Sequence, residues 1–195
     1  MTQKGICKDT IIAMAVQMVE QSGEPEISMR ELAEQLNIKT PSLYNHIKSM
    51  EELLSEVSRY AAEQLKEAQL AAMSGKNDDE AVVALATTYR AYAKEHKGLY
   101  KAIMASSHLT TDSGHPSSGA MMIPVLEALS QFDLNEKQMM HWQRILRSIM
   151  HGFVAQENAG FFRNDTADSD DSFLKAIHCF LSGMKAERGE QEYAG

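Results

Sequence analysis

The sequence predicts an all-α protein, and three observations support this fold class. The 195 residues include only 4 prolines and 11 glycines, so few positions interrupt a helix. Apolar residues recur at helical spacing, as at Ile11, Ala15 and Val19, whereas alternating β-branched runs are scarce. Capping residues precede several of these stretches. We expect a three-helix N-terminal unit, joined by a long helix to a C-terminal helical bundle.

The first two helices have recognisable ends. The first is predicted over residues 9–21 and ends before Gly23, a residue type typical of the position just after a helix. The second begins at Ser28, which forms a capping box with Glu31 three residues later. Asn37 then opens a short turn, because asparagine tolerates the left-handed backbone conformation.

The third helix is predicted to be short, and a long helix follows it. Thr40 is its expected N-cap, Pro41 occupies the first helical position, and the helix ends at about Ile47. A new capping box at Ser49 and Glu52 begins the long helix over residues 49–72. At 1.5 Å per residue this helix would be roughly 35 Å long, enough to connect two domains.

The remainder of the chain predicts further helices separated by polar loops. We expect one domain at residues 1–50 and a second domain at residues 51–195. Residues 108–119 and the acidic stretch 163–171 are expected to be loops. The helices are expected at residues 79–96, 99–106, 120–131, 135–158 and 170–188.

The composition argues against several classes of protein. There are 27 acidic and 19 basic residues, giving a formal charge of −8, so the chain is not coated with positive charge. No apolar run reaches the roughly 18 residues of a membrane helix, and the N-terminus is polar, so we expect neither a membrane span nor secretion. Cys7 and Cys179 are too distant in sequence for a redox pair and indicate reduced thiols in the cytoplasm.

Residues 28–47 predict a helix-turn-helix, because two short helices are joined by a tight turn. Leu43 and Ile47 are four residues apart and would anchor the second helix to the core. Lys39 and Lys48 flank this helix, and no acidic residue lies between them. Polar side chains gather where such a helix reaches base edges, at Thr40, Ser42, Tyr44, Asn45 and His46.

The stretch from Ile27 to Leu54 resembles the TetR family of transcriptional regulators. Leu43-Tyr44-x-His46 and the later Glu51-x-Leu53 carry the resemblance, which is strong over about residues 9–56. The sequence Thr-Pro-Ser-Leu-Tyr at residues 40–44 is most similar to that of the tetracycline-repressor subgroup. The resemblance implies a dimeric regulator, usually a repressor, that binds a near-palindromic double-stranded DNA operator.

The resemblance also assigns contacts to particular residues. Two departures from the family pattern bear on them: Asn37 replaces a frequent glycine, and Met50 replaces a frequent lysine that contacts phosphate. The loss of one contact lowers the slope of the salt dependence by roughly one unit. Base contacts are implied for Thr40, Pro41, Ser42 and Asn45, and phosphate contacts for Ser28, Tyr44, His46 and Lys48.

The C-terminal half resembles a regulatory domain of TetR-like proteins. Trp142, the run His151-Gly152-Phe153 and the pair Gly160-Phe161 carry this resemblance. It implies that the last two long helices pair with their copies in a homodimer, and that a small-molecule effector binds in this domain. Residues 1–50 are then expected to be the DNA-binding domain, and residues 51–195 the ligand-binding and dimerisation domain. Methionines and aromatic residues could line an apolar site for that effector: Tyr89, Tyr92, Met104, Met121, Met122, Trp142 and Phe153.

Other classes of function have less support. The sequence lacks the dinucleotide-binding, phosphate-loop, nucleophile-elbow and zinc-protease motifs, so we expect neither an enzyme nor a cofactor. His141 and His151 are ten residues apart, which is wrong for a helical metal site. A dimeric helical adaptor or ligand-binding protein with little DNA affinity is the alternative that the acidic charge and Met50 favour.

The acidity is unevenly distributed along the chain. Residues 1–50 contain five basic and six acidic residues, a net charge of −1, which leaves −7 for the rest. Bulk acidity therefore does not exclude DNA binding by residues 37–48. It predicts weak non-specific affinity, with recognition dependent on base contacts and on the dimer.

Overall fold

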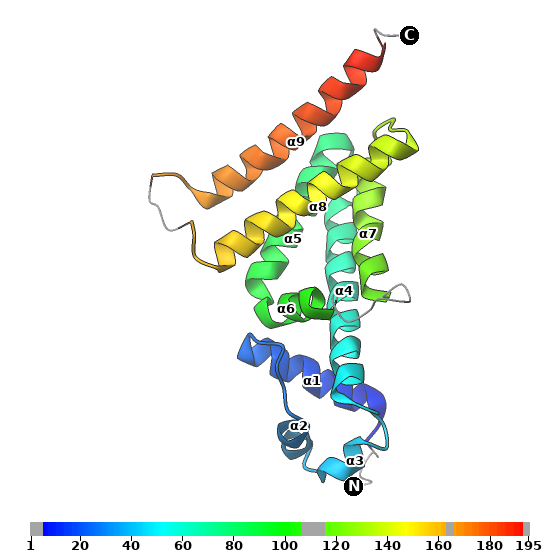
Figure 1. The fold of residues 1–195 in the computed structure, drawn as a ribbon, viewed down its shortest axis with the longest axis vertical. Coiled ribbons are helices and arrows are strands. Elements are labelled where there is room, and N and C mark those ends of the chain that lie inside the picture. The colour runs from blue at the N-terminus through cyan, green and yellow to red at the C-terminus, as the bar shows by residue number, and fades with distance from the viewer. Residues whose placement is uncertain (1–5, 107–115, 163–165, 193–195) are drawn as a thin grey trace. The chain divides into compact units, whose positions relative to one another are not determined.

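A computed structural model describes residues 6–106, 116–162 and 166–192 (Figure 1). In these ranges the regular elements are all α-helices, which confirms the predicted fold class. No helix of the described ranges is long and apolar enough to cross a membrane. The helices are α1 (Lys8–Ser22), α2 (Met29–Gln35), α3 (Thr40–Leu43), α4 (Met50–Met73), α5 (Asp78–Glu95), α6 (Lys97–Ser106), α7 (Pro116–Leu129), α8 (Glu136–Asn158) and α9 (Ser169–Glu192).

The chain folds into two compact units, and the polypeptide passes from one unit to the other three times. The first unit comprises Met1–Gln64 and Glu95–Ala120, and the second comprises Leu65–Lys94 and Met121–Gly195. Helices α4 and α7 therefore each begin in the first unit and end in the second. The functional division at residue 50 stays a prediction, because it concerns DNA and ligand binding rather than compactness.

The first unit begins with helices whose ends match the predicted signals. Gly23 adopts a φ of 71° and donates its N–H to the carbonyl of Val19, which closes α1. At the start of α2, Ser28 Oγ accepts from the Glu31 N–H at 3.1 Å, and the Glu31 carboxylate accepts from the Ser28 N–H at 3.3 Å. The predicted capping box is confirmed. Asn37 adopts a φ of 54° in the turn that follows.

The third helix differs from its predicted bounds. It ends at Leu43 rather than at about Ile47, and its N-cap is Lys39 rather than Thr40, with no side-chain cap. The chain stays tightly wound beyond α3, because the amides of His46 and Ile47 both donate to the carbonyl of Leu43. This shared carbonyl ends the regular helix while Ile47 still reaches the core, where its side chain is fully buried.

The start of α4 also follows a modified capping pattern. Ser49 Oγ accepts from the Glu52 N–H at 3.1 Å, as predicted. The Glu52 carboxylate accepts from the N–H of Lys48 at 2.7 Å, however, and not from that of Ser49. The same carboxylate is held by Lys8, 2.8 Å away, so α1 and α4 are joined at this point.

Helix α6 packs closely against α1 within the first unit. A Cβ at Gly98 would lie 2.1 Å from the Val19 carbonyl oxygen, so only glycine fits there. Two pairs of polar side chains flank this contact. His96 Nδ1 lies 2.6 Å from Glu20, and Lys101 pairs with Glu24.

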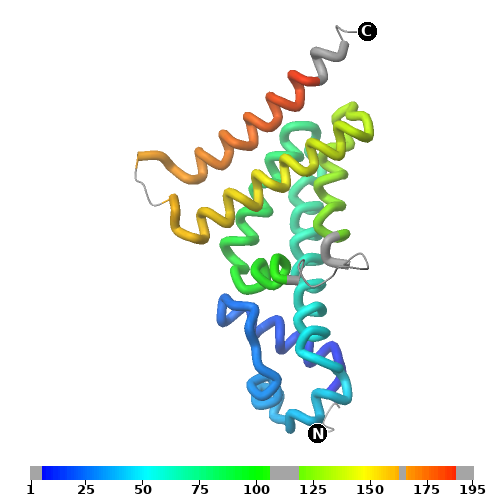
Figure 2. The backbone as a smooth tube through the Cα atoms, in the orientation of Figure 1, coloured from blue at the N-terminus to red at the C-terminus, as the bar shows by residue number. Residues whose placement is uncertain are grey.

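The second unit contains the paired helices α8 and α9, which run beside each other in opposite directions (Figure 2). Asn135 caps α8, and its side chain and that of Gln138 form a capping box. Helix α9 buries one stripe of apolar side chains at helical spacing. The buried residues of this stripe are Phe173, Ile177, Phe180, Leu181 and Met184.

Two predicted loops are shorter than expected. Helix α7 already begins at Pro116, so residues 116–119 of the predicted 108–119 loop are helical. Residues 108–115 lie outside the described residues. Residues 166–168 are not helical, whereas α9 begins at Ser169. Asp168 explains this early start, because its Oδ1 accepts from the Asp170 N–H at 2.6 Å.

Candidate DNA-binding site

The predicted DNA-reading segment, residues 39–48, is anchored by two apolar side chains. Leu43 and Ile47 are fully buried, and the hydrogen-bonded turn after Leu43 fixes the backbone between them. The residues between these anchors, Tyr44, Asn45 and His46, therefore lie on the outside and are exposed. A buried pair four residues apart thus presents three consecutive polar side chains on a rigid support.

The structure brings the sequence-predicted DNA-contacting residues onto this segment, with one exception. Lys39, Pro41 and Lys48 are exposed, and Thr40 and Ser42 are half-buried. Tyr44 exposes 54% of its surface, which is high for an aromatic side chain. Ser28 lies outside the segment, at the start of α2, where its hydroxyl oxygen caps the helix and its O–H can still donate.

The polar side chains of the segment have no partner within the described part of the protein. No hydrogen bond or ion pair there engages the side chains of Lys39, Thr40, Ser42, Tyr44, Asn45, His46 or Lys48. By contrast, nearby cations are neutralised. Lys8 pairs with Glu52 and Glu56, and Arg30 pairs with Glu34. Arg59 pairs with Glu56, so across residues 6–64 the cations without an ion-pair partner are Lys39 and Lys48, at the two ends of the segment.

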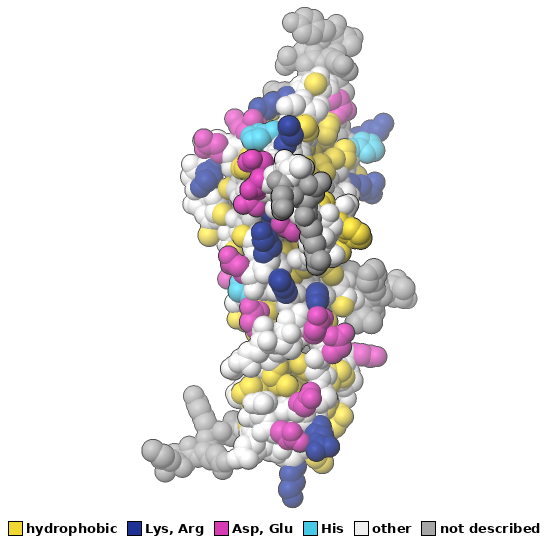
Figure 3. Space-filling view, turned by 90° about the vertical axis from the view of Figure 1, so that its left-hand side faces the viewer, with side chains coloured by type: hydrophobic (Ala, Val, Ile, Leu, Met, Phe, Trp, Pro, Cys, Tyr) yellow, Lys and Arg dark blue, Asp and Glu magenta, His cyan; other side chains and the backbone are white. Residues whose placement is uncertain are grey.

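On the face shown in Figure 3, the described basic and acidic side chains are intermingled and form no broad basic patch. Such a surface attracts a polyanion weakly, so the few free donors of residues 39–48 would have to supply most of the binding.

The predicted effector-contacting residues are not all in one unit. Met104 belongs to the first unit, and the other six belong to the second. Tyr89 and Tyr92 are buried, and Met121 and Met122 are half-buried. Their contact with an effector stays a prediction.

Two of the predicted effector contacts have close neighbours within the second unit. Trp142 packs edge-to-face on Phe180 with ring centres 5.4 Å apart, and its Nε1 is buried with no hydrogen-bond partner among the described residues. Phe153 stacks with Phe162 at 4.7 Å and with Phe173 at 5.0 Å. The described structure therefore already surrounds the Phe153 ring with aromatic neighbours.

Sequence reasoning missed an ion cluster centred on the buried side chain of Arg90. Its guanidinium donates to both oxygens of Glu157, at 2.8 and 2.6 Å, and to Asp170 at 2.7 Å. The same group lies 5.4 and 5.2 Å from the ring centres of Phe153 and Phe173. These contacts join α5, the end of α8 and the start of α9.

The Arg90 cluster lowers the pKa of Glu157, and the position of Arg90 in the sequence could have identified it. The hydrogen bonds from Arg90 hold the pKa of Glu157 below its usual value, against the opposing effect of burial. In the sequence, Arg90 falls four residues after Ala86 and three before Ala93, both buried. A charge within an apolar helical stripe could have identified it.

The all-helical fold and the anchored, unpartnered segment 39–48 define a helix-turn-helix regulator of transcription. Matches to family models agree with this class. Residues 11–57 match the model of bacterial regulatory proteins of the tetR family, and residues 82–180 match the tetracyclin repressor-like C-terminal domain. The chain belongs to the TetR family of DNA-binding transcription regulators. This confirms both resemblances inferred from the sequence.

Curated relatives span most of the chain. An uncharacterized HTH-type transcriptional regulator of Mycobacterium tuberculosis, Rv0681, is 29% identical over 182 residues, covering 92% of this chain and 82% of its own. YobS of Bacillus subtilis, also an uncharacterized HTH-type regulator, is 26% identical over 180 residues, covering 92% and 93%.

A solved structure shows the same fold. Apo ActR from Streptomyces coelicolor superposes with a TM-score of 0.74 at 18% identity, covering 97% of this chain and 100% of its own. ActR in complex with actinorhodin also matches, with a TM-score of 0.69 at 16% identity and coverage of 95% and 99%. At these identities the likeness concerns the fold.

Proposed function

We propose that the protein is a homodimeric repressor that binds a near-palindromic operator and is released from it by a small-molecule effector. The observation that carries the DNA-binding part is the segment 39–48, with buried anchors at Leu43 and Ile47 and unpartnered polar side chains between and beside them. Thr40, Pro41, Ser42 and Asn45 would contact bases, and Ser28, Tyr44, His46 and Lys48 would contact phosphates, with Lys39 as a further cation.

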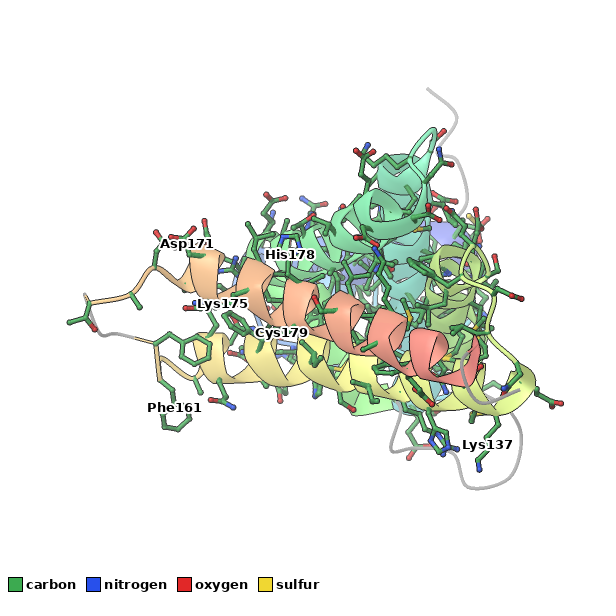
Figure 4. All side chains as sticks on the ribbon, turned by 90° about the horizontal axis from the view of Figure 1, so that it is seen from above. Lys137, Phe161, Asp171, Lys175, His178 and Cys179 are labelled. Atoms are coloured by element: carbon green, nitrogen blue, oxygen red, sulfur yellow. The ribbon has the colours of Figure 1, made fainter. Side chains whose placement is uncertain are left out.

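The homodimer would form through α8 and α9. Apolar side chains are exposed on α8, where Met140 exposes 46% and Ile145 exposes 42% of their surfaces. Helix α9 exposes small residues at helical spacing, namely Cys179, Gly183 and Ala186, which permit close approach of another helix. In Figure 4, α9 lies along α8 with Cys179 on the helix surface. A two-fold axis through this surface would give a dimer with two DNA-reading segments, one from each protomer, related by the axis.

The effector would act through the second unit, to which six of the seven predicted effector-contacting residues belong. The chain returns from this unit to the first at the α5–α6 junction, where only His96 separates the two helices. Helix α6 then lies against α1 at Gly98. An effector that binds better to a state with wrongly spaced DNA-reading segments lowers operator affinity by its differential binding.

Release of DNA by a cell-derived compound tests this proposal. A labelled operator fragment, first selected from genomic DNA of the source organism, is bound to the purified full-length protein. Small-molecule extracts of the same cells are then added while fluorescence anisotropy is recorded. The proposal expects release by at least one extract fraction, with the protein still dimeric by light scattering. Binding that no fraction affects would leave a regulator without an effector and contradict the repressor-release mechanism.

A further inference from the structure

The buried polar side chains of the second unit differ in what they bond to. Gln69 Nε2 donates to the Leu85 carbonyl at 3.2 Å, Gln138 completes the cap of α8, and Arg90 is held by Glu157 and Asp170. Each of these side chains therefore has a structural role. Gln143 is 4% exposed, yet its Oε1 is buried with no hydrogen-bond partner among the described residues.

The other end of the Gln143 amide is also poorly satisfied. Its Nε2 approaches the sulfur of Met140, 3.3 Å away and one turn earlier on α8, and sulfur is a weak acceptor. Rotating the amide by half a turn would replace the unpartnered oxygen with an unpartnered NH₂ group, so no orientation satisfies it. A buried polar group without a partner destabilises the folded state by about 1–3 kcal/mol.

The position of Gln143 places this unsatisfied oxygen in the interior of the second unit. It lies three residues before Leu146 and seven before Met150, on the inward-facing stripe of α8. Leucine would fit that stripe without the cost of the amide. The amide is therefore best explained by a partner that the isolated chain does not contain.

The charges around this interior restrict what the partner can be. Among the described residues of the second unit, Arg90 is the charged side chain that is buried, and its charge is balanced by Glu157 and Asp170. An ionised ligand would find no free counter-charge there and would lose its hydration. A carbonyl oxygen accepts hydrogen bonds, so it selects an N–H or O–H donor.

We propose that Gln143 is the polar recognition group for the effector, and that the effector is an uncharged, largely apolar compound carrying a hydrogen-bond donor. This inference rests on the proposed function, because it assigns the chemistry of the effector-binding unit. Binding would satisfy Oε1 and remove the cost of its burial, so the donor contributes to affinity without a charge.

Two identical substitutions on one helix separate recognition from structure. Gln143→Leu removes the unsatisfied amide, so it should leave the thermal unfolding temperature unchanged or raised. Gln138→Leu, five residues earlier and also buried, removes half of a helix cap and should lower that temperature. We therefore expect Gln143→Leu to lose ligand recognition without losing stability, and Gln138→Leu to lose stability without losing ligand recognition.

Three probes with one ring system test the ligand chemistry by calorimetric titration of the full-length protein. The probes are 2-naphthol, which is neutral and has an O–H donor, 2-methoxynaphthalene, which lacks the donor, and 2-naphthoate, which is anionic. We expect the wild type and Gln138→Leu to bind 2-naphthol at least about tenfold more tightly than the other two. In Gln143→Leu, this preference for 2-naphthol over 2-methoxynaphthalene should disappear.

The inference is overturned if the wild type does not bind 2-naphthol up to its solubility limit or prefers 2-naphthoate. It is equally overturned if Gln143→Leu retains the preference for the donor, or if this variant is clearly less stable than the wild type. Binding of the same variants to a selected operator fragment distinguishes failure of the role proposed for Gln143 from failure of the proposed function. Intact DNA binding with a failed probe result refutes only the role of Gln143, whereas absent DNA binding by the wild type refutes the proposed function itself.

Discussion

Residues 39–48 include two kinds of side chain with different consequences for DNA binding. A phosphate contact is the same on every sequence, whereas a base contact depends on the donors and acceptors in the groove. Tyr44 and Lys48 are exposed, and phosphate contacts are expected for them, whereas Asn45 offers an amide that can pair with a base edge. This distinction is testable with single substitutions.

Asn45→Ala should change sequence preference, and Lys48→Ala should weaken binding to all sequences about equally. Loss of a bidentate base contact lowers discrimination by about 1–3 kcal/mol at that position, whereas loss of a lysine reduces the salt slope by about one unit per protomer. Mobility-shift assays on operator variants at several salt concentrations measure both. Arg30→Ala is the matched control, because Arg30 is exposed but neutralised by Glu34. A uniform effect of Asn45→Ala would remove this residue from base recognition.

Glu157 makes the stability of the second unit dependent on pH. Its pKa is lowered in the folded protein, chiefly by hydrogen bonds from Arg90, so the stabilisation is present above its ordinary pKa and is lost as the pH falls through the folded value. Glu157→Gln should therefore reduce the free energy of unfolding most near neutral pH and least in acid.

Urea unfolding at about pH 7 and about pH 4, on either side of the ordinary carboxyl pKa, measures this difference. Glu127→Gln on α7 is the control, because Glu127 is exposed and its carboxylate has no partner in the described chain. A loss of stability in Glu157→Gln that is the same at both pH values would show that the charge of Glu157 is not responsible.

At the level of elements, local signals predicted helices well and their ends less well. Ser28 and Glu31 identified the start of α2, because a cap depends on residues three positions apart in sequence. Thr40 was the wrong cap for α3, since the backbone of Lys39 occupies that position and the chain tightens again at Leu43 to bury Ile47. Tertiary packing of this kind cannot be read from spacing alone.

Contacts between distant segments explain what sequence analysis missed. Arg90 and Glu157 are 67 residues apart, and Gly98 and Val19 meet across two helices, so neither contact has a local pattern. Candidate DNA-contacting residues could be named from the sequence because the helix-turn-helix is contiguous, and their contacts with DNA stay a prediction. The unsatisfied oxygen of Gln143 required the structure, because glutamine is common on helices and its burial depends on neighbouring helices.

Gly98→Ala should separate α6 from α1 and destabilise the first unit. A Cβ there would meet the backbone of Val19, which cannot rotate away as a side chain can, so overpacking of about 1–3 kcal/mol is expected. A Cβ at Gly119 on α7 would meet no atom of the described residues within 4 Å, so Gly119→Ala should be neutral or stabilising. Circular-dichroism melting of both variants measures the effect. Equal melting temperatures would mean that α6 does not press on α1.

At the scale of the whole molecule, the proposed function requires two copies of the chain. The segment 39–48 supplies few free cations, so one copy would bind DNA weakly, and two linked segments would bind with a gain in effective concentration. The exposed apolar side chains of α8 are the expected contact between the copies. A substitution that prevents dimerisation should therefore also weaken DNA binding.

Ile145→Glu should convert the dimer into a folded monomer with much reduced DNA affinity. Ile145 is 42% exposed in the single chain, so the substitution costs the protomer little but buries a charge in the interface. Ile123→Glu on α7 changes a side chain that is 48% exposed and should leave the dimer intact. Light scattering gives the mass of each. A dimeric Ile145→Glu variant would exclude this face of α8.

Selection of fragments from genomic DNA by the purified wild-type protein, with sequencing of the bound pool, tests whether the protein recognises a specific operator. We expect enrichment of fragments that share a near-palindrome, with half-sites about one helical turn or more apart. A variant with Thr40, Ser42 and Asn45 all replaced by alanine should lose this enrichment while remaining folded and dimeric. Failure of the wild type to enrich any fragment at low salt, or enrichment of the same motif by the triple variant, would contradict it.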